Sequence, residues 1–198
     1  LHDLLSSSRV PCVRLEHIYR QAQNSQITEN AHRILEGQYP SSPGPGDELS
    51  DFFLLHLDDV EDIHKAIEAM VARRIPSRFG LDPKTDVQVL VPMHRGTLGA
   101  ETLNERLQEL LNPDGKPISG FPRIRFGDRV IQTRNNYDLD VSNGDVGIVI
   151  GPGFEEGSIC VRFDHRDIHY PSVAADDLRL AYALSIHKSQ GSEYPAVI

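Results

Sequence analysis

Residues 183–193 read Ala183-Leu-Ser-Ile-His-Lys-Ser-Gln-Gly-Ser-Glu193, an apolar strand that runs into a polar loop containing a glycine. A second apolar run follows the loop. Ligands of parallel sheets bind where a strand ends and its loop begins, so this loop is a candidate site. His187, Lys188 and Ser189 suit phosphate oxygens, and Gly191 permits the close approach of a backbone. A solvated loop between two core strands is the alternative interpretation.

Outward from this loop, strands that alternate with helices predict an α/β layer with a largely parallel sheet. Val87–Val91 is a continuous apolar run of strand length. Helices are expected after Asp58 or Asp59 and after Thr97, with these residues as N-caps. The other expected elements are strands at 13–15, 52–57 and 180–185, a helix from Ser25 to about Glu36, and the end of the helix after Thr97 at Asn112-Pro113.

From about residue 118 the pattern changes to short strands separated by turns, with no helix between them. The expected strands lie at 123–134, 147–150, 158–164 and 167–170. A module of this kind indicates a small SH3-like β-barrel. The strand at 180–185 then resumes the α/β pattern, so the barrel is an insertion. The predicted limits are 1–117 and 176–198 for the α/β domain and 118–175 for the barrel.

The chain has 198 residues and a formal net charge of −9, with an ordinary globular composition. Its negative charge is concentrated in residues 47–62, so the net value does not exclude a nucleic-acid partner. Basic residues gather elsewhere, at His94 and Arg95 and in the set Arg123, Arg125, Arg129 and Arg134. This clustering is compatible with a locally positive surface on an acidic protein, so the net charge decides little.

The two cysteines, Cys12 and Cys160, lie far apart and form no C-x-x-C pattern, which is typical of reduced thiols. No apolar run comes close to the length of about 20 residues that a membrane helix needs. We therefore expect no membrane partner and a cytoplasmic location. The chain lacks an initiator Met and stops within an apolar run, which indicates a piece of a longer protein.

Four segments, in order, resemble superfamily 1 helicases and the RecD branch in particular. Residues 183–193 resemble motif V, and Leu15-Glu-His-Ile-Tyr-Arg-Gln21 looks like motif IV. Val91-Pro-Met-His-Arg-Gly-Thr-Leu-Gly99 is similar to the strand-to-loop segment that follows motif IV. Gly127-Asp-Arg-Val-Ile-Gln-Thr-Arg-Asn-Asn-Tyr137, with Asn143-Gly-Asp-Val-Gly147, resembles the barrel inserted in RecD-type proteins. The resemblance implies a RecA-like second motor domain, of the P-loop NTPase type, with an inserted SH3-like barrel.

The resemblance also implies a nucleotide site. Arg20 would be the catalytic arginine that reaches the γ-phosphate of ATP, and Tyr19 would lie near the adenine. An arginine supplied from a second domain neutralises charge that develops in phosphoryl transfer, which agrees with this role. A surface salt bridge is the alternative for Arg20. Glu193 would accept hydrogen bonds from the ribose hydroxyls, and Gln21 and Gly191 complete the implied nucleotide-binding set.

The DNA-binding residues implied by the resemblance come from three segments. They are His94, Arg95, Arg134, Asn135, Tyr137, His187, Lys188 and Ser189. In the barrel segment, an arginine, two amides and an aromatic ring form a set that can grip and stack on single-stranded DNA. The alternative is a turn in which the asparagines satisfy backbone groups, with Tyr137 as a plug of the barrel. For Arg95 the alternative is a loop that serves only to cap the next helix through Thr97.

Two patterns that suggest metal binding are set aside. The run 52–57 followed by Asp58 and Asp59 mimics a strand that ends in a magnesium carboxylate, yet the sequence has no G-x-x-x-x-G-K phosphate loop. The aspartates are expected to cap the following helix instead. His165 and His169 are expected to bind no metal, because their spacing falls across a hairpin and not along a helix.

For the intact protein, the resemblance implies ATP-dependent translocation 5′ to 3′ on DNA and duplex unwinding in recombination and repair, as in the exodeoxyribonuclease V alpha subunit. ATP and Mg²⁺ are its expected cofactors. None is expected on this chain, which should be inactive alone because it lacks the phosphate loop. Expected partners are single-stranded DNA and the preceding RecA-like domain, with RecB- and RecC-like subunits as candidates. A non-catalytic nucleic-acid- or protein-binding module on the same scaffold is the alternative hypothesis.

Overall fold

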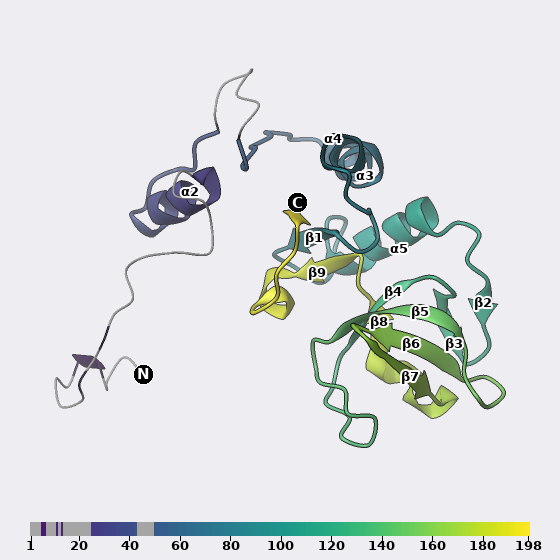
Figure 1. Cartoon of the computed structure of the whole chain (residues 1–198). Helices are drawn as coiled ribbons and strands as arrows, with labels where there is room; N and C mark the ends of the chain where they lie inside the picture. Colours follow the sequence, from purple (N-terminus) through teal and green to yellow (C-terminus); the bar gives the residue numbers. More distant parts are fainter. Residues whose placement is uncertain (1–4, 7–10, 12, 14–24, 43–49) are drawn as a thin grey trace. The chain divides into compact units, whose positions relative to one another are not determined.

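The computed structural model describes residues 5–6, 11, 13, 25–42 and 50–198. The chain forms two compact units, Leu1–His56 and Leu57–Ile198, and all the strands named below lie in the second (Figure 1). The predictions for Tyr19, Arg20 and Gln21, and for residues 14–15 of the first expected strand, fall outside the described residues. In the described ranges, no helix has the length and apolar character needed to cross a membrane.

The first unit contains helix α2, Gln26–Leu35, close to its predicted position. Ser25 is the N-cap: its Oγ accepts from the backbone N–H of Thr28 at 3.3 Å and donates to Oδ2 of Asp51 at 2.6 Å. The backbone N–H of Gln26 donates to Oδ1 of the same carboxylate at 2.8 Å. Asp51 therefore places negative charge at the start of the helix, where the N–H groups are unpaired and the dipole favours an anion.

The predicted strand at 52–57 is wrong. These residues adopt no regular secondary structure, and none of the sheets in the described part of the chain includes them. An apolar run forms a strand only where its backbone N–H and C=O groups find a neighbouring strand to pair with. Sequence pattern alone does not show whether such a neighbour exists.

Helix α3, Val60–Ala69, begins at Asp59 as predicted, because Oδ1 of Asp59 accepts from the backbone N–H groups of Glu61 and Asp62 at 2.9 and 3.1 Å. The helical path continues through a π-helical turn, η1 (Met70–Arg74), into α4 (Ile75–Phe79). Gly80, at φ +68°, ends it, since a left-handed residue terminates the helix and costs least as glycine.

A three-stranded parallel sheet forms the centre of the α/β part, in the order β10-β1-β9. The central strand β1 is Val87–Val91, as predicted, and its neighbours are β9 (Ala183–Ser185) and β10 (Ala196–Val197). Leu103 and Leu107 of helix α5 (Ala100–Leu111) join β1 in one buried core. Strands and helices therefore form the expected α/β layer.

Thr97 is not the N-cap of α5. Gly99 occupies that position, without a side-chain hydrogen bond to the start of the helix. The backbone oxygen of Thr97 instead accepts from Nε2 of His64 at 2.8 Å. The helix starts later than expected because the chain first makes a turn, closed by a hydrogen bond from the N–H of Gly99 to the oxygen of Gly96 at 3.0 Å. The predicted end at Asn112 is confirmed.

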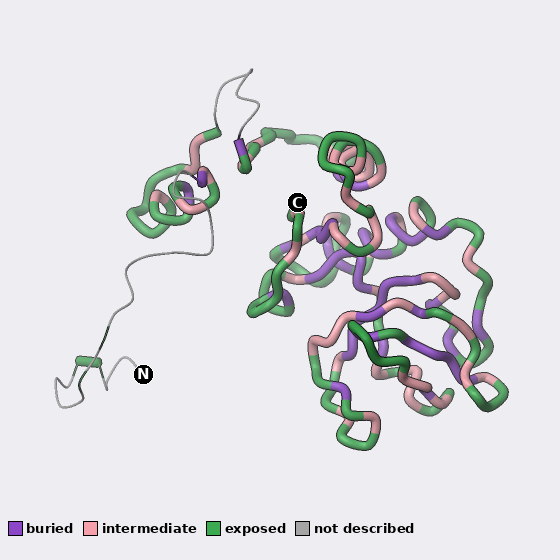
Figure 2. Tube along the Cα trace, viewed as in Figure 1, coloured by how far each residue is buried: buried purple, intermediate pink, exposed green. Residues whose placement is uncertain are grey.

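The β-rich part is a five-stranded antiparallel sheet in the order β7-β6-β5-β4-β8, with the two-stranded ribbon β2-β3 sharing its core. The strands are β2 (Pro117–Ile118), β3 (Phe121–Arg125), β4 (Arg129–Gln132), β5 (Val146–Pro152), β6 (Ile159–Phe163), β7 (Arg166–Tyr170) and β8 (Leu178–Leu180), and the 3₁₀ turn η2 (Ser172–Asp177) precedes β8. Figure 2 shows the buried positions along these strands.

Two predicted strands are divided in the structure. The run 123–134 breaks at Gly127, whose φ of +86° turns the chain between β3 and β4. The run 180–185 breaks at Ala181 and Tyr182, so that β8 pairs with β4 while β9 pairs with β1. Two short strands that adjoin in sequence therefore belong to different sheets. The residues expected to resume the α/β domain begin by closing the sheet of the barrel.

Candidate nucleic-acid interface

Two loops that the sequence singled out leave the parallel sheet at the same edge. Val91, the last residue of β1, is the register partner of Ser185, the last residue of β9, and the two strands are parallel. The segments 92–99 and 186–195 therefore begin side by side at the carboxyl ends of neighbouring strands. Ligands of α/β sheets bind at this edge. The exposed side chain of Arg95 lies in the first segment, and exposed His187 and Lys188 lie in the second.

The loop 92–99 is held by contacts on both sides. Its Thr97 carbonyl is fixed by buried His64 of α3, and the hydroxyl of Thr102 in α5 donates to the Gly96 oxygen at 3.0 Å. Nε2 of His94 lies 3.4 Å from Oε1 of Glu101, so a phosphate that contacted His94 would compete with this carboxylate. Of the two predicted DNA contacts in this loop, only His94 forms an ion pair among the described residues, so Arg95 is more accessible to a phosphate.

The loop after β9 starts with a 3₁₀ turn, η3 (Ile186–Ser189). Ser189 is 8% exposed, unlike His187 and Lys188, and its backbone oxygen accepts from the N–H of Ser192 at 3.1 Å. The surface available to a nucleic acid therefore comes from His187 and Lys188. Gly191 follows at φ +88°, and a Cβ placed there would meet no atom within 4 Å. Its conformation and its open surroundings both permit close approach of a ligand.

Helix α5 fixes the strand that leads into this loop. Nδ2 of Asn104 donates to the backbone oxygen of Ala183 at 2.8 Å, and the N–H of Ala183 donates to Oδ1 of Asn104 at 2.9 Å. β9 is an edge strand of the described sheet, so this buried amide occupies backbone groups that a further strand would otherwise pair with. Sequence patterning did not identify Asn104, because a polar residue at one position of an amphipathic helix carries no signal of its partner.

The barrel segment 132–137 forms the turn that one interpretation predicts, and it leaves exposed the side chains that the DNA-binding interpretation needs. Oδ1 of Asn135 accepts from the N–H of Asn143 at 2.9 Å, and Oδ1 of Asn136 accepts from the N–H of Leu139 at 3.1 Å. The asparagines therefore satisfy backbone groups in a turn. Tyr137 is 88% exposed, so it is not a plug of the barrel, and its ring is accessible for stacking. Arg134 is exposed, with Nη1 at 3.9 Å from Oδ1 of Asp177.

Arg123, Arg125, Arg129 and Arg134 do not form a single positive surface. Arg125 is paired with Glu109, and the hydrogen bond to this carboxylate raises the pKa of the guanidinium above its ordinary value. Arg129 is buried, and this desolvation lowers the pKa of its guanidinium. Arg123 is exposed. Of the four, only Arg123 and Arg134 are exposed, because Arg129 is buried and Arg125 is partly buried against Glu109.

Asp128, which is fully buried, accepts hydrogen bonds from both the barrel and the α/β part. Its Oδ1 accepts from Oη of Tyr182 at 2.9 Å and from Nδ2 of Asn112 at 2.7 Å. Its Oδ2 accepts from the side chain of Gln108 and from the backbone N–H of Arg125. We call these five residues the Asp128 cluster. Burial, with the nearby charge of Asp128, raises the pKa of Tyr182, which therefore remains a donor.

No group of His, Cys, Asp and Glu among the described residues has the arrangement of a metal site. His169 has its Nε2 at 3.8 Å from Sγ of Cys160, and its ring stacks on Phe154 with centroids 3.5 Å apart. Burial raises the pKa of the Cys160 thiol, which opposes formation of the metal-binding thiolate.

Comparisons with known proteins agree with this architecture. A family model described as "ATP-dependent RecD-like DNA helicase SH3 domain" matches residues 103–163. The ATP-dependent RecD2 DNA helicase of Deinococcus radiodurans is 34% identical over 196 residues, which are 98% of this chain and 25% of that protein. The RecBCD enzyme subunit RecD of Mycolicibacterium smegmatis is 28% identical over 146 residues, which are 70% of this chain and 25% of that protein. The chain thus spans about a quarter of the length of these relatives.

Solved structures share the fold. The crystal structure of Pif1 helicase from Bacteroides in complex with ADP-AlF3 and ssDNA has a TM-score of 0.55 at 20% identity, over 93% of this chain and 44% of that chain. The crystal structure of Bacteroides Pif1 bound to ssDNA has a TM-score of 0.50 at 17% identity, over 91% of this chain and 43% of that chain. At this identity, the likeness concerns the path of the backbone.

Proposed function

Because this chain belongs to the RecD-type superfamily 1 helicases, we propose that it provides the second RecA-like domain and the SH3-like barrel of an ATP-dependent DNA helicase. The intact protein would couple ATP hydrolysis to 5′-to-3′ translocation on single-stranded DNA and to duplex unwinding in recombination and repair. The observation that carries the proposal is the register pair Val91 and Ser185, which starts the Arg95 and Lys188 loops at one edge of a parallel sheet.

The proposed DNA surface consists of Arg95, His187 and Lys188, joined in the barrel by Arg134, Asn135 and Tyr137. All of these side chains are exposed. The cations would contact phosphates, which supply affinity without sequence preference, while the Tyr137 ring would stack on a base. His94 would take part only if a phosphate displaced its neighbour Glu101. Ser189, being buried, would support the loop from within.

Two separate sets of residues are proposed to contact the nucleotide: Tyr19, Arg20 and Gln21, with Arg20 acting on the γ-phosphate, and Gly191 with Glu193. ATP and Mg²⁺ would be held mainly by a phosphate loop and acidic residue of another domain, because this sequence has no phosphate-loop motif. We propose that the chain alone therefore hydrolyses no ATP.

RecB- and RecC-like subunits are candidate partners, since one relative is a RecBCD subunit. We propose that the barrel is an insertion in the α/β domain, with β8 closing its sheet after residue 175.

The DNA surface is tested by fluorescence anisotropy with a labelled oligothymidylate at several salt concentrations. The variant Arg95→Ala with Lys188→Ala is expected to bind more weakly and to reduce the slope of log K against log salt by about 0.7 for each phosphate that is no longer bound. The matched control is Arg73→Ala with Arg74→Ala, which removes two exposed cations from η1. Equal loss in both double variants would show attraction by overall charge and contradict a localised site.

The nucleotide role is tested in a longer protein that joins this chain to a phosphate-loop domain. Arg20→Ala is expected to lower DNA-stimulated ATP turnover by about a thousandfold, the scale of a lost arginine finger. Arg20→Lys should recover little, because a single ammonium does not reproduce the planar fork of a guanidinium. Unchanged turnover in Arg20→Ala would disprove the role of this arginine.

A further inference from the structure

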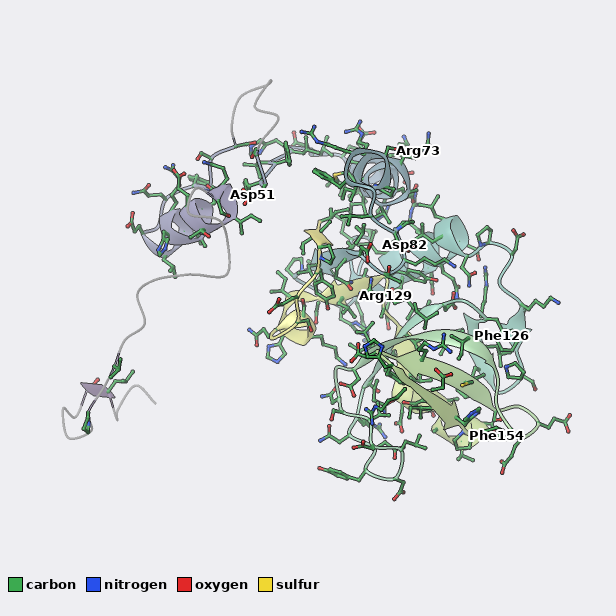
Figure 3. All side chains as sticks on the ribbon, in the orientation of Figure 1. Asp51, Arg73, Asp82, Phe126, Arg129 and Phe154 are labelled. Carbon is green, nitrogen blue, oxygen red and sulfur yellow. The ribbon has the colours of Figure 1, made fainter. Side chains whose placement is uncertain are left out.

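Arg129, the first residue of β4, is buried between the barrel and the α/β part (Figure 3). Its Nη1 donates to the backbone oxygen of Lys84 at 2.9 Å and to that of Val87 at 3.1 Å. Both acceptors lie at or just before the start of β1. The guanidinium carbon lies 5.6 Å from the ring centroid of Tyr194, within the range of a cation–π contact.

This environment is unusual for a charged side chain. No ion pair between described residues includes Arg129, so its hydrogen-bond partners here are neutral carbonyl oxygens. Burial lowers the pKa of the guanidinium, while the nearby Tyr194, Asp86 and Tyr182 act in the opposite direction. Arginine nevertheless remains charged in proteins. Burial of a cation without a paired carboxylate costs free energy. Removal of any remaining contact to the guanidinium, such as the Tyr194 ring, is therefore expected to have a large effect.

Tyr194 lies in the segment 190–195 that joins β9 to β10, directly after Glu193. The far end of this segment is attached to the strand beside it, because the N–H of Ala196 donates to the oxygen of Asp86 at 3.0 Å. The near end follows η3, which carries His187 and Lys188. Gly191 lies within the segment and has no side chain, and a Cβ placed there would meet no atom within 4 Å. The Arg129–Tyr194 contact ties this segment to the barrel.

We infer that Arg129 is a positioning residue: it holds the ring of Tyr194 and thereby fixes the segment 190–195, with Glu193, to the first residue of strand β4. Asp128, its neighbour in sequence, is held by α5 and Tyr182. The two consecutive residues thus attach one end of β4 to separate parts of the α/β layer. The consequence for nucleotide affinity rests on the proposed function, in which Glu193 contacts the ribose. The structural part does not depend on it.

The structural part is tested by amide hydrogen exchange on the 198-residue chain. Tyr194→Leu removes the ring and is expected to speed exchange in 191–196 about tenfold, with β5 and β6 unchanged. Tyr194→Phe keeps the ring face and should exchange like the original chain. Arg129→Lys should resemble Tyr194→Leu, because an ammonium cannot bond both carbonyls and cover the ring. Unaltered exchange in Tyr194→Leu would overturn the inference, as would equal loosening in Tyr194→Phe.

The nucleotide part is tested in the longer protein through the split between KM and kcat. Tyr194→Leu is expected to raise the KM for ATP about fivefold with kcat nearly unchanged, since it loosens a binding contact and not the reacting phosphate. Tyr194→Phe should restore the original KM. A changed exchange pattern with an unchanged KM would retain the positioning role and overturn the ribose contact of Glu193. A KM change without any exchange change would overturn the positioning role itself.

Discussion

Oη of Tyr182 donates to Oδ1 of Asp128 at 2.9 Å, and this bond joins the linker between β8 and β9 to the turn before β4. Both residues are buried, and Asp128 accepts from three further donors. A carboxylate has about four lone-pair positions, so the Asp128 cluster satisfies it fully. Hydrogen bonding of this kind compensates the desolvation of a buried charge, and it fixes where the chain passes from the barrel to the parallel sheet.

Asp128→Asn is expected to lower the free energy of unfolding by about 3 kcal/mol, because the amide nitrogen replaces an acceptor where every surrounding group is a donor. Urea unfolding followed by circular dichroism measures the change. Asp114→Asn is the matched control, since Asp114 is exposed, and a change within about 0.5 kcal/mol is expected there. A similar small change in Asp128→Asn would contradict the structural role of the cluster.

Two buried tyrosines predict how stability changes at alkaline pH. Desolvation raises the pKa of both Tyr170 and Tyr182 above the ordinary value of 10.0. The folded state therefore holds these protons more tightly than the unfolded state. Their contribution to stability is complete below pH 10 and is lost as the pH rises through the folded pKa values, at about 1.4 kcal/mol per pH unit for each group.

The measurement is phenolate absorbance against pH, beside circular dichroism. Tyr170 and Tyr182 should ionise only as the chain unfolds. Tyr170→Phe should reduce the absorbance change that accompanies unfolding. Ionisation of Tyr170 and Tyr182 before unfolding would contradict their burial in the folded chain.

Local signals explain which parts of the fold were predictable. The apolar run Val87–Val91 and the capping side chain of Asp59 carry their information within a few residues, and both appear as expected. The strand expected at 52–57 failed because strand formation depends on a distant partner. The division of 180–185 between two sheets depends on pairing with β4 and β1, which lie at least 40 residues upstream. A local sequence pattern does not reveal partners at this separation.

The candidate site shows the same limit. The loops with Arg95 and Lys188 were identified by their residue types and by the resemblance, and the register pair Val91 and Ser185 brings them together. The burial of Asp128 and Arg129 was not predicted, because charged residues are buried only when tertiary partners satisfy them. Those partners come from α5, from just before β1, from the β8–β9 linker and from the segment 190–195. The roles of Tyr19 and Arg20 remain predictions.

Gly99→Ala is expected to weaken binding of single-stranded DNA, because a Cβ at this position would lie 2.5 Å from the carbonyl carbon and 2.6 Å from the oxygen of Arg95. These are backbone atoms, so the loop that carries Arg95 must shift. A destabilisation of about 1–3 kcal/mol is expected as well, the usual scale of overpacking. Gly151→Ala is the control, since a Cβ at that position would meet no atom within 4 Å and its φ is not in the left-handed region.

Anisotropy titration with the oligothymidylate and urea unfolding of both glycine variants separate the two effects. If Gly99→Ala lost stability but kept the full affinity for DNA, the 92–99 loop would not belong to the binding surface. Loss of affinity in Gly151→Ala would instead point to the barrel hairpin at β5. Neither outcome is expected from the positions of the two glycines.

Tyr137→Ala is expected to lower the affinity for single-stranded DNA about tenfold and to leave the unfolding midpoint unchanged, because the ring is exposed and its removal takes away one base-stacking surface. Phe154→Ala is the matched control: Phe154 is 86% exposed, yet it lies in the β5–β6 hairpin against His169, beside the acidic Glu155 and Glu156. Negative charge there disfavours a nucleic acid, so its removal should leave DNA affinity unaltered. Equal affinities for Tyr137→Ala and the original chain would exclude base stacking on Tyr137 at the barrel turn.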